Sequence, residues 1–338
     1  MRLAAITLLL VACGSELPVE VIDPASTFPF GPYTIEPSQE ISDQCVQITM
    51  HNEADVFVNQ VELTTGPGFH HSNWFFVPEN VFQGEDGPFK CDDRNYSEPA
   101  AAVFGGVLFA QSTQAPHEIQ KFPDGVALKI PRRSKIIAQV HLLNSGDAPI
   151  TVTPEIGLVA IPEADVTTLL AGISFENQAL GLPPNMQSKF TLECDIAAQH
   201  QRILERAPDF RIYYALAHYH ELGTALTVEA VRPDNTSARV FTTADRAGDV
   251  LGGPIAPLFD FTGFTKLRFS CEFYNPRSEE VTWGIGDQEM CVFLAFSDSP
   301  YNWGGGATTR EPPGPRTDVD GVATFTHDCD VFGIDASR

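Results

Sequence analysis

Short runs of apolar and β-branched residues recur along most of the chain, and they constrain its fold more than any other feature. In residues 55–64 apolar side chains such as Val56 and Val58 recur at the two-residue period of a strand with one buried face. Turn-forming sequences such as Asn144-Ser145-Gly146-Asp147 separate the runs. The other predicted strands are residues 135–144, 151–161, 190–195, 211–222, 225–231, 266–274 and 290–296.

Helix signals are few, and the best are residues 196–206 and a short segment at 164–171. Residues 301–321 are rich in Gly, Pro and Thr, which predicts a long surface loop. This pattern predicts an all-β protein of antiparallel, jelly-roll-like β-sandwiches. A chain of 338 residues exceeds the usual size of one core, so we expect two domains. We place the seam near Leu169, which gives domains at 38–168 and 169–338.

The charge of the chain excludes one large class of partners. With 44 acidic and 21 basic residues the net charge is -23, which repels a phosphate backbone. Nucleic acid is therefore not an expected partner.

The N-terminus reads as an export signal. Arg2 precedes a short apolar stretch that is too short to span a bilayer, and Leu10-Val11-Ala12-Cys13 resembles a bacterial lipobox. We predict a lipoprotein signal at residues 1–13, a lipid on Cys13 and a tether at 14–37; an ordinary secretory signal is the alternative. Either form predicts an exported protein, periplasmic or at the cell surface, whose contact with a membrane is through a lipid anchor only.

Export changes how the remaining six cysteines are read, because an oxidising compartment favours disulfides. Two of them precede the middle of the chain and four follow it, which favours one bridge in the first half and two in the second. We predict the pairs Cys45–Cys91, Cys194–Cys329 and Cys271–Cys291. Oxidised sulfur is a poor metal ligand, so any soft ligand must come from methionine.

His218 and His220 lie in the predicted strand at 211–222, where residues two apart point to the same face. Such a pair can chelate a metal, although two half-buried histidines with ordinary hydrogen bonds are the plainer alternative. His70 and His71 are adjacent, so they reach one metal only from a bend or strand end, which Gly66-Pro67-Gly68 supplies. His141, alone in an apolar strand, is a core histidine unless it is the third ligand of that pair.

Met290 is one of four methionines and could simply fill the core. A thioether beside two imidazoles, however, suits a copper ion that cycles between its two oxidation states, because soft sulfur favours Cu(I) and imidazole accepts either state. The first half thus offers His70, His71 and His141, and the second offers His218, His220 and Met290.

In this order along the chain, these residues resemble the copper type II, ascorbate-dependent monooxygenases, the family of peptidylglycine α-hydroxylating monooxygenase and dopamine β-monooxygenase. The resemblance covers nearly the whole mature chain. It is carried by Phe69-His70-His71, Phe109-Ala110-Gln111, Phe122-Pro123-Asp124-Gly125-Val126, Gln139-Val140-His141, Ala217-His218-Tyr219-His220-Glu221-Leu222-Gly223 and Gly286-Asp287-Gln288-Glu289-Met290-Cys291.

The resemblance implies two β-sandwich domains that face each other across a solvent-accessible cleft, with one copper ion in each. His70, His71 and His141 would hold an electron-transfer copper. His218, His220 and Met290 would be the catalytic set and hold the copper that meets dioxygen and substrate. Ascorbate would be the reductant, and the product would be a hydroxylated C–H bond.

Departures from the family concern the substrate. Peptide-amidating members carry an arginine two residues before the His-x-His pair, where this chain has Leu216, and an Asn and a Tyr after the methionine, where it has Val292 and Leu294. A peptide ending in glycine is therefore a poor candidate, and Leu216 and Leu294 predict a more apolar, small organic substrate.

Two functions follow from these residues. The first is a monooxygenase whose partners are dioxygen and a small molecule, with no obligate protein partner. The second is a non-catalytic exported copper-binding protein or copper chaperone on the same fold. A chaperone would carry exchangeable Met-rich or His-rich tracts, and four methionines form none, which favours the enzyme.

Overall fold

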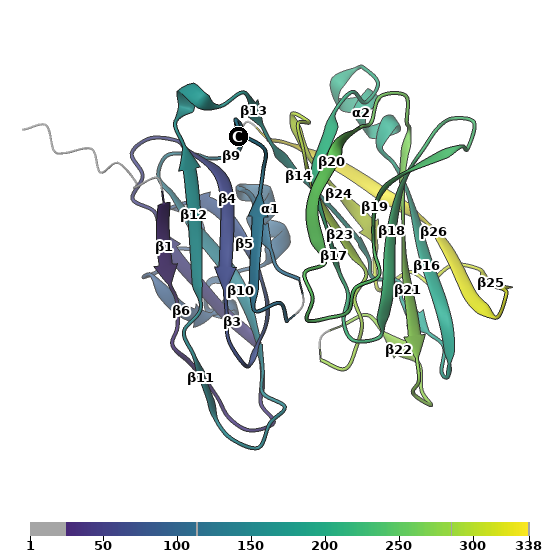
Figure 1. Cartoon of the computed structure of the whole chain (residues 1–338), viewed down its shortest axis with the longest axis horizontal. Helices are drawn as coiled ribbons and strands as arrows, with labels where there is room; N and C mark the ends of the chain where they lie inside the picture. The colour runs from purple at the N-terminus through teal and green to yellow at the C-terminus, as the bar shows by residue number, and fades with distance from the viewer. Residues whose placement is uncertain (1–24, 113, 285, 337–338) are drawn as a thin grey trace, which may run out of the picture.

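The computed structural model describes residues 25–112, 114–284 and 286–336. It is an all-β protein of two β-sandwich domains, whose strands pair mostly antiparallel (Figure 1). The predicted signal, Cys13 and the first part of the predicted tether lie outside the described residues. In the part of the chain that is described, no helix is both long and apolar enough to cross a membrane.

The N-terminal domain packs two sheets face to face. One sheet has the order β1-β12-β4-β9-β13, with β8 also paired to β4, and the other has the order β6-β3-β10-β5-β7. Alternate residues of these strands, such as Val58, Trp74 and Ile136, fill the core between the sheets. The strands are β1 Ala25–Pro29, β3 Glu40–Thr49, β4 Val56–Thr64, β5 Phe69–Pro78, β6 Gly87–Lys90, β7 Gly106–Ala110, β8 His117–Lys121, β9 Val126–Ile130, β10 Ser134–Leu143, β12 Glu155–Ile161 and β13 Thr168–Leu169.

The prediction of a tether through residue 37 is wrong for its described part. Strand β1 pairs with β12, and β2 (Tyr33–Ile35) pairs with β11 (Ile150–Val152). Phe30, Tyr33 and Ile35 are buried in the domain core, and this burial holds the segment against the sandwich despite its prolines. Pro29 ends β1 at the edge of its sheet, where a missing N–H breaks no ladder.

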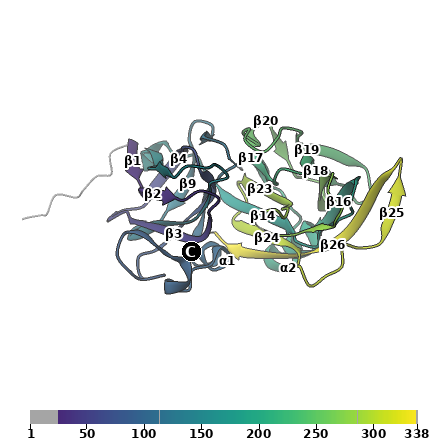
Figure 2. The same ribbon diagram turned by 90° about the horizontal axis from the view of Figure 1, so that it is seen from below.

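The C-terminal domain is one eleven-stranded sheet folded into two layers, in the order β19-β18-β21-β16-β26-β24-β14-β23-β17-β20 with β25 paired to β26. The long strand β26 joins the layers, because its first part runs parallel to β16 and its last part antiparallel to β24 (yellow in Figures 1 and 2). The strands are β14 Ala171–Asn177, β16 Met186–Asp195, β17 Arg211–His218, β18 Gly223–Val231, β19 Ser237–Thr243, β20 Gly252–Asp260, β21 Lys266–Asn275, β23 Val292–Ser297, β24 Tyr301–Ala307, β25 Arg316–Val319 and β26 Val322–Asp335, with the short pair β15 Gly181–Leu182 and β22 Val281–Thr282.

Helices are short and peripheral. Helix α2 (Ile196–Leu204) is close to the prediction, and Asp195 caps it by accepting from the backbone N–H of Ala198. The other helical segments are α1 Glu98–Phe104 and the 3-10 turns η1 Cys91–Arg94 and η2 Glu163–Asp165. The helix expected at 164–171 is wrong, because β13 in that segment pairs with β9. The sheet of the C-terminal domain begins at Ala171, directly after this pairing.

The loop expected at 301–321 is also wrong, since β24 and β25 lie within it. Strand β24 lies between β14 and β26, and its glycines let the backbones of these neighbours approach closely. A Cβ atom on Gly305 would lie 1.9 Å from the Asp330 carbonyl oxygen, so any larger residue would push the strands apart. Glycine here serves the close approach of two backbones rather than a turn.

The described residues form three disulfides, and they are the three predicted pairs. Cys45–Cys91 joins β3 to η1, Cys194–Cys329 joins β16 to β26, and Cys271–Cys291 joins β21 to the segment before β23. The last of these bridges anchors the residue that follows Met290.

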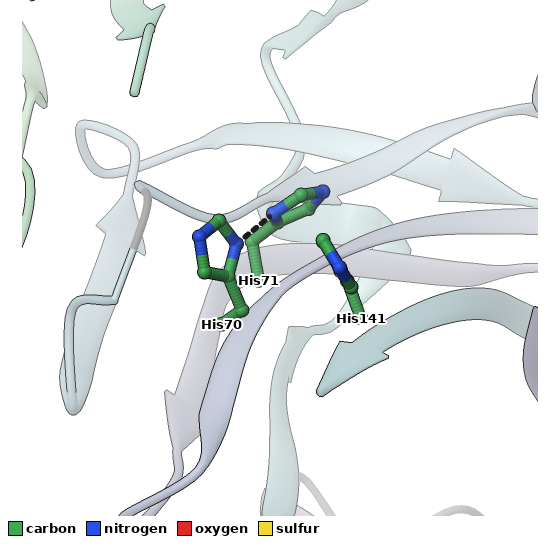
Figure 3. Close-up of side chains that lie close together, drawn as sticks. All are labelled: His70, His71 and His141. Atoms are coloured by element: carbon green, nitrogen blue, oxygen red, sulfur yellow. Dashed lines mark hydrogen bonds between the residues drawn. The ribbon is translucent and has the colours of Figure 1, made fainter. Parts of the chain in front are cut away.

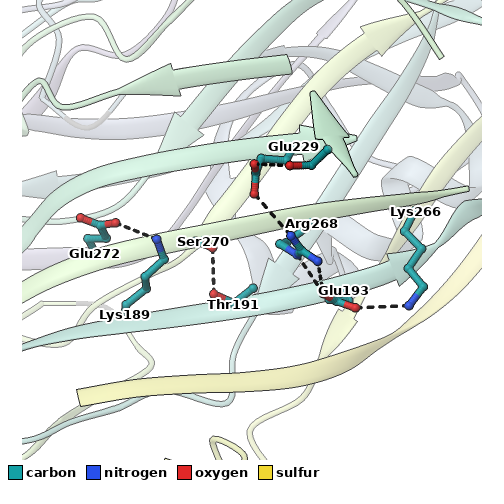
Figure 4. A network of polar contacts seen from close by, with 9 residues as sticks. Lys189, Thr191, Glu193, Glu229, Lys266, Arg268, Ser270 and Glu272 are labelled. Carbon is teal, nitrogen blue, oxygen red and sulfur yellow. Dashed lines mark hydrogen bonds and ion pairs between the residues drawn. The ribbon is translucent and has the colours of Figure 1, made fainter. Parts of the chain in front are cut away.

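Polar pairs cover the outer face of β16, β18 and β21 (Figure 4). Arg268 lies 2.7 Å from Glu193 and 3.6 Å from Glu229, and Lys266 lies 3.2 Å from the same Glu193 carboxylate. These cross-strand pairs shield one face of the sheet while its other face fills the core.

The two domains pack against each other through apolar residues. Tyr213, Tyr214, Leu216 and Phe296 of the C-terminal domain belong to the hydrophobic cluster of the N-terminal domain. A hydrogen bond from the backbone N–H of Leu251 to Ser112 Oγ, 2.8 Å long, also crosses between the domains. This packing brings the ends of β5, β10 and β17 together.

Candidate metal centre

The first-half histidines converge at the start of β5 and the end of β10. His70 and His71 are the second and third residues of β5, and their Nδ1 atoms lie 2.9 Å apart (Figure 3). The ring centroids of His70 and His141 are 4.7 Å apart, and those of His71 and His141 are 5.1 Å apart. The pairing of β5 with β10 shifts register between His141 and Leu142, and this irregularity at the strand end lets adjacent residues turn toward one another.

The second-half pair is held differently from the prediction. Strand β17 ends at His218, so His220 lies in the turn that follows and the two do not share a strand face. Their ring centroids are nevertheless 5.4 Å apart. The prediction of a regular strand through residue 222 is wrong. The buried Glu289 carboxylate accepts hydrogen bonds from the backbone N–H groups after His218, and these N–H groups form a turn instead of strand pairs.

Glu289 is 1 % exposed and binds three backbone N–H groups. Its carboxylate accepts hydrogen bonds from the N–H of His220 at 2.9 Å, of Leu222 at 2.7 Å and of Met290 at 3.3 Å. It therefore fixes the turn that carries His220 against the segment that carries Met290.

Met290 lies just before β23 and is half-buried. Strands β17 and β23 are antiparallel, with His218 opposite Val292, so continuing this register puts Met290 opposite His220. The backbone of the proposed soft ligand is thus next to the second histidine pair.

The two histidine sets meet. The centroids of His71 and His218 are 4.8 Å apart, and those of His70 and His220 are 5.5 Å apart. Two groups have ligand nitrogens that all lie within 4.8 Å of one another, and His71 belongs to both: His70, His71, His141 and His71, His218, His220. The separate sites expected from the sequence are therefore in contact, because the apolar domain faces that carry them pack together.

The environment keeps these imidazoles neutral. Desolvation, followed by the neighbouring His141 and His220, lowers the pKa of His70 to about 3. Desolvation is also the largest cause that lowers the pKa values of the other four histidines. Metal ligation requires a neutral imidazole with a free lone pair, and the lowered pKa values keep these histidines in that form.

Two ring nitrogens have the hydrogen-bonding pattern of metal ligands. His141 Nε2 donates to Glu40 Oε1 at 2.7 Å, and His220 Nδ1 donates to the Gln288 carbonyl oxygen at 2.8 Å. Within the part of the chain that the structure describes, the opposite nitrogens, His141 Nδ1 and His220 Nε2, are buried and have no hydrogen-bond partner. Since a ligating histidine typically donates its other N–H to such an acceptor, this donor set fits a copper ion.

The two substrate candidates lie on the same small apolar cavity. Leu216 and Leu294 are paired across β17 and β23, and both line it together with residues of the N-terminal domain. Leu216 and His218 are two residues apart on β17, so their side chains point to the same face of the sheet. The other lining residues include Val107, Ala110, Gly172, Tyr214 and Phe296.

The sequence did not reveal the residues that orient the ligands. Glu289 lies inside the motif Gly286-Asp287-Gln288-Glu289-Met290-Cys291, but no pattern marks its carboxylate as the partner of three N–H groups. Glu40 is 101 positions from His141, so only the pairing of β3 with β10 brings it there.

Comparisons with known proteins leave the activity open. No family model and no curated protein matches the chain. Among solved structures, PNGase F, a glycosylasparaginase from Flavobacterium meningosepticum, is 10% identical with a TM-score of 0.36, and the match covers 92% of this chain and all of that one. The PBSX exported protein XepA is 8% identical with a TM-score of 0.22, covering 80% of this chain and 86% of that one.

Proposed function

We propose that this protein is a copper- and ascorbate-dependent monooxygenase that hydroxylates a C–H bond of a small organic substrate. The observation that carries the proposal is the convergence of five histidines from two domains into two overlapping groups with ligand nitrogens within 4.8 Å. The order of these residues, with Met290, is also the basis of the family resemblance.

Bound copper would supply the one-electron redox chemistry that couples ascorbate to dioxygen. In the overall reaction two electrons from ascorbate and two protons accompany dioxygen, one oxygen atom enters the C–H bond and the other leaves as water. The chain itself would hold the ions and orient their ligands. Glu40 and the Gln288 carbonyl fix the ring tautomers, and the packed domain faces limit the access of water.

Roles differ between the two sets. We assign electron transfer to His70, His71 and His141, and the reaction with dioxygen and substrate to His218, His220 and Met290. The second set has the soft thioether that favours Cu(I), and its His218 lies on the same strand, β17, as Leu216 of the apolar cavity.

The substitution Met290→Ile tests this division. It removes the thioether but keeps an apolar side chain, so we expect copper to remain on the first set while turnover is lost. Copper analysis and ascorbate-dependent oxygen uptake measure the two effects. Wild-type activity in the variant would contradict the assignment of roles.

We propose that the part of the substrate that contacts Leu216 and Leu294 is apolar. Leu216 and Leu294 line a small apolar cavity, Leu216 lies two residues before His218 on β17, and neither leucine can bind a carboxylate. The three disulfides suit an oxidising compartment, which supports the proposal of an exported protein anchored through Cys13.

The deciding experiment measures oxygen consumption with ascorbate and copper against a library of small apolar compounds. Consumption coupled one to one with a hydroxylated product supports the monooxygenase. Copper binding without coupled turnover on any compound would favour the non-catalytic copper-binding protein instead.

A further inference from the structure

The Glu40 carboxylate lies between a ligand of the first set and the loop that leads to Met290. Glu40 is the first residue of β3, and its Oε1 accepts a hydrogen bond from His141 Nε2 at 2.7 Å. The carboxylate also lies against Gly286 of the C-terminal domain, since a Cβ atom on this glycine would be 3.1 Å from Glu40 Oε2 and 3.3 Å from Oε1. One side chain of the N-terminal domain thus contacts a candidate ligand and the neighbouring domain.

The loop at 286–290 carries two groups of the second set. The Gln288 carbonyl oxygen accepts from His220 Nδ1 at 2.8 Å, and Met290 follows two residues later. Within its own domain the loop is fixed by Gln288 Oε1, which accepts from the N–H and the hydroxyl of Thr282 at 2.9 and 3.0 Å. Gly286 has φ +65°, a left-handed conformation that favours glycine. The loop therefore turns at the residue that meets Glu40.

The charge of Glu40 acts on both sets. A carboxylate that accepts from a ligating imidazole makes that ring a stronger donor to the metal. This favours Cu(II) over Cu(I), since the ion of higher charge gains more from a nearby negative charge. Desolvation is the largest influence on the pKa of His220 and lowers it, and the charge of Glu40 opposes that effect. Because 36% of the Glu40 side chain is exposed, solvent screens its field, and we expect effects of moderate size.

We propose that Glu40 positions ligands of both sets. It orients the His141 ring and strengthens it as a donor, and its contact with Gly286 places the 286–290 loop, with Met290, against the N-terminal domain. The inference deepens the proposed function and rests on it for the choice of metal. It assigns no contact between Glu40 and copper, and it leaves each ion in its own set.

Copper titration of Glu40→Gln tests the effect on the first set. The variant is measured together with His218→Ala, which removes a ligand from the second group and leaves the first complete. Gln keeps the size of the side chain but not its charge, so we expect Cu(II) to bind about tenfold more weakly and Cu(I) to bind equally well. That tenfold change corresponds to a reduction potential about 59 mV higher. The matched control is the exposed Glu36→Gln, which makes the same change of charge. Equal loss of Cu(II) and Cu(I) affinity, or equal values for the two variants, would overturn this role of Glu40.

A double-mutant cycle with Gly286→Ala tests the contact between the domains. The new methyl group would lie 3.1 Å from Glu40 Oε2, a tighter approach than is usual for carbon and oxygen, so it should shift the carboxylate relative to His141. We expect Gly286→Ala to weaken Cu(II) at the first set at least threefold, although residue 286 belongs to the other domain, and to have no such effect when Glu40 is replaced by Ala. The strain of a positive φ is the same in both backgrounds and cancels. The same loss in both backgrounds, or none in either, would overturn the contact.

X-ray absorption of the chain loaded with Cu(I) tests the second set. Its sulfur contribution reports Met290, since the first set holds no sulfur. Glu40→Ala removes the carboxylate that meets the loop, so we expect this contribution to fall at least twofold, whereas Glu36→Ala should keep it. An unchanged contribution in Glu40→Ala would overturn the positioning of the loop. If the wild-type chain binds no copper at these histidines, the proposed function fails together with this inference. If it binds copper and the Glu40 variants match the Glu36 variants, this inference alone fails.

Discussion

At the scale of single residues, the candidate centre depends on groups that orient the histidines as much as on the histidines. The Glu289 carboxylate is buried and holds the backbone of His220 and Met290 in one place. Desolvation raises the pKa of this carboxyl to about 7, so its burial has an energetic cost that three backbone donors offset. Glu289 thus positions two candidate ligands through their backbone.

Replacing Glu289 by Gln should weaken copper binding at the second set by roughly ten- to a hundredfold, as is typical when an orienting partner is lost. The amide keeps the size of the side chain but turns an N–H₂ group toward backbone donors that need an acceptor. Copper titration measures the loss, and the exposed neighbour Glu221→Gln is the matched control. Equal affinity in the two variants would show that Glu289 does not position the ligands.

The candidate ligands, and the half of the chain from which each comes, could be predicted from the sequence, but the groups that orient them could not. A pair such as His218 and His220 stands out by spacing alone. The contact of Glu40 with His141 depends on the register of β3 against β10, which no local pattern encodes. No local pattern encodes the hydrogen bond between the His220 N–H and Glu289 either.

At the scale of elements, the segment from β7 to β8 links the domains. Glu118 on β8 is 1 % exposed and accepts from the Ser112 N–H at 2.7 Å and the Ser112 hydroxyl at 2.9 Å. The same hydroxyl oxygen accepts from Leu251 N–H of the other domain. Desolvation raises the pKa of Glu118 to about 7, although both bonds from Ser112 oppose the rise.

The buried Glu118 predicts a defined pH dependence. Its pKa is higher in the folded chain than its ordinary value, so the protonated form favours folding. This contribution is fully present below the unfolded pKa near 4.5 and is lost as the pH rises through about 7. As the pH rises from 4.5 to about 7, the free energy of unfolding of Glu118→Gln should increase by roughly 3 kcal/mol relative to that of the wild type. Urea unfolding at several pH values across this range measures the difference. A constant difference between the two proteins at every pH would contradict this.

In the C-terminal sheet, a buried and a surface side chain are expected to contribute differently to the free energy of unfolding. Phe190 is fully buried and stacks on Phe325 with centroids 4.6 Å apart, so Phe190→Ala should cost about 3–5 kcal/mol of unfolding free energy. Arg268 is partly exposed, and Arg268→Ala should cost less than about 1 kcal/mol despite its two ion pairs. Urea unfolding of both variants measures the ranking, and the reverse order would mean that the outer polar network stabilises the sheet more than its core does.

Strands with alternating or continuous apolar runs could be predicted from the sequence, as β4, β10 and β21 show. The strands that were missed depend on distant partners. Strand β24 has three consecutive glycines, which locally indicate a loop, and it forms because β14 and β26 pair with it on both sides. Strand β1 forms because β12 offers it an edge.

At the scale of the whole molecule, the packing of the two domains decides what the histidines can do. Leu216, Tyr214 and Phe296 bury their side chains in the neighbouring domain, and this contact brings His71 to His218. The sequence indicates two domains and the candidate ligands that each contributes. It does not indicate how far apart the sets lie, because that distance follows from the fit of two apolar surfaces formed by many separate strands.

The most direct test of the central claim is copper-edge anomalous diffraction from crystals of the copper-loaded chain. The account predicts two anomalous peaks within the histidine cluster, one beside His70 and His141 and one beside His218 and His220. Peaks elsewhere on the molecule, or none at these histidines, would contradict it.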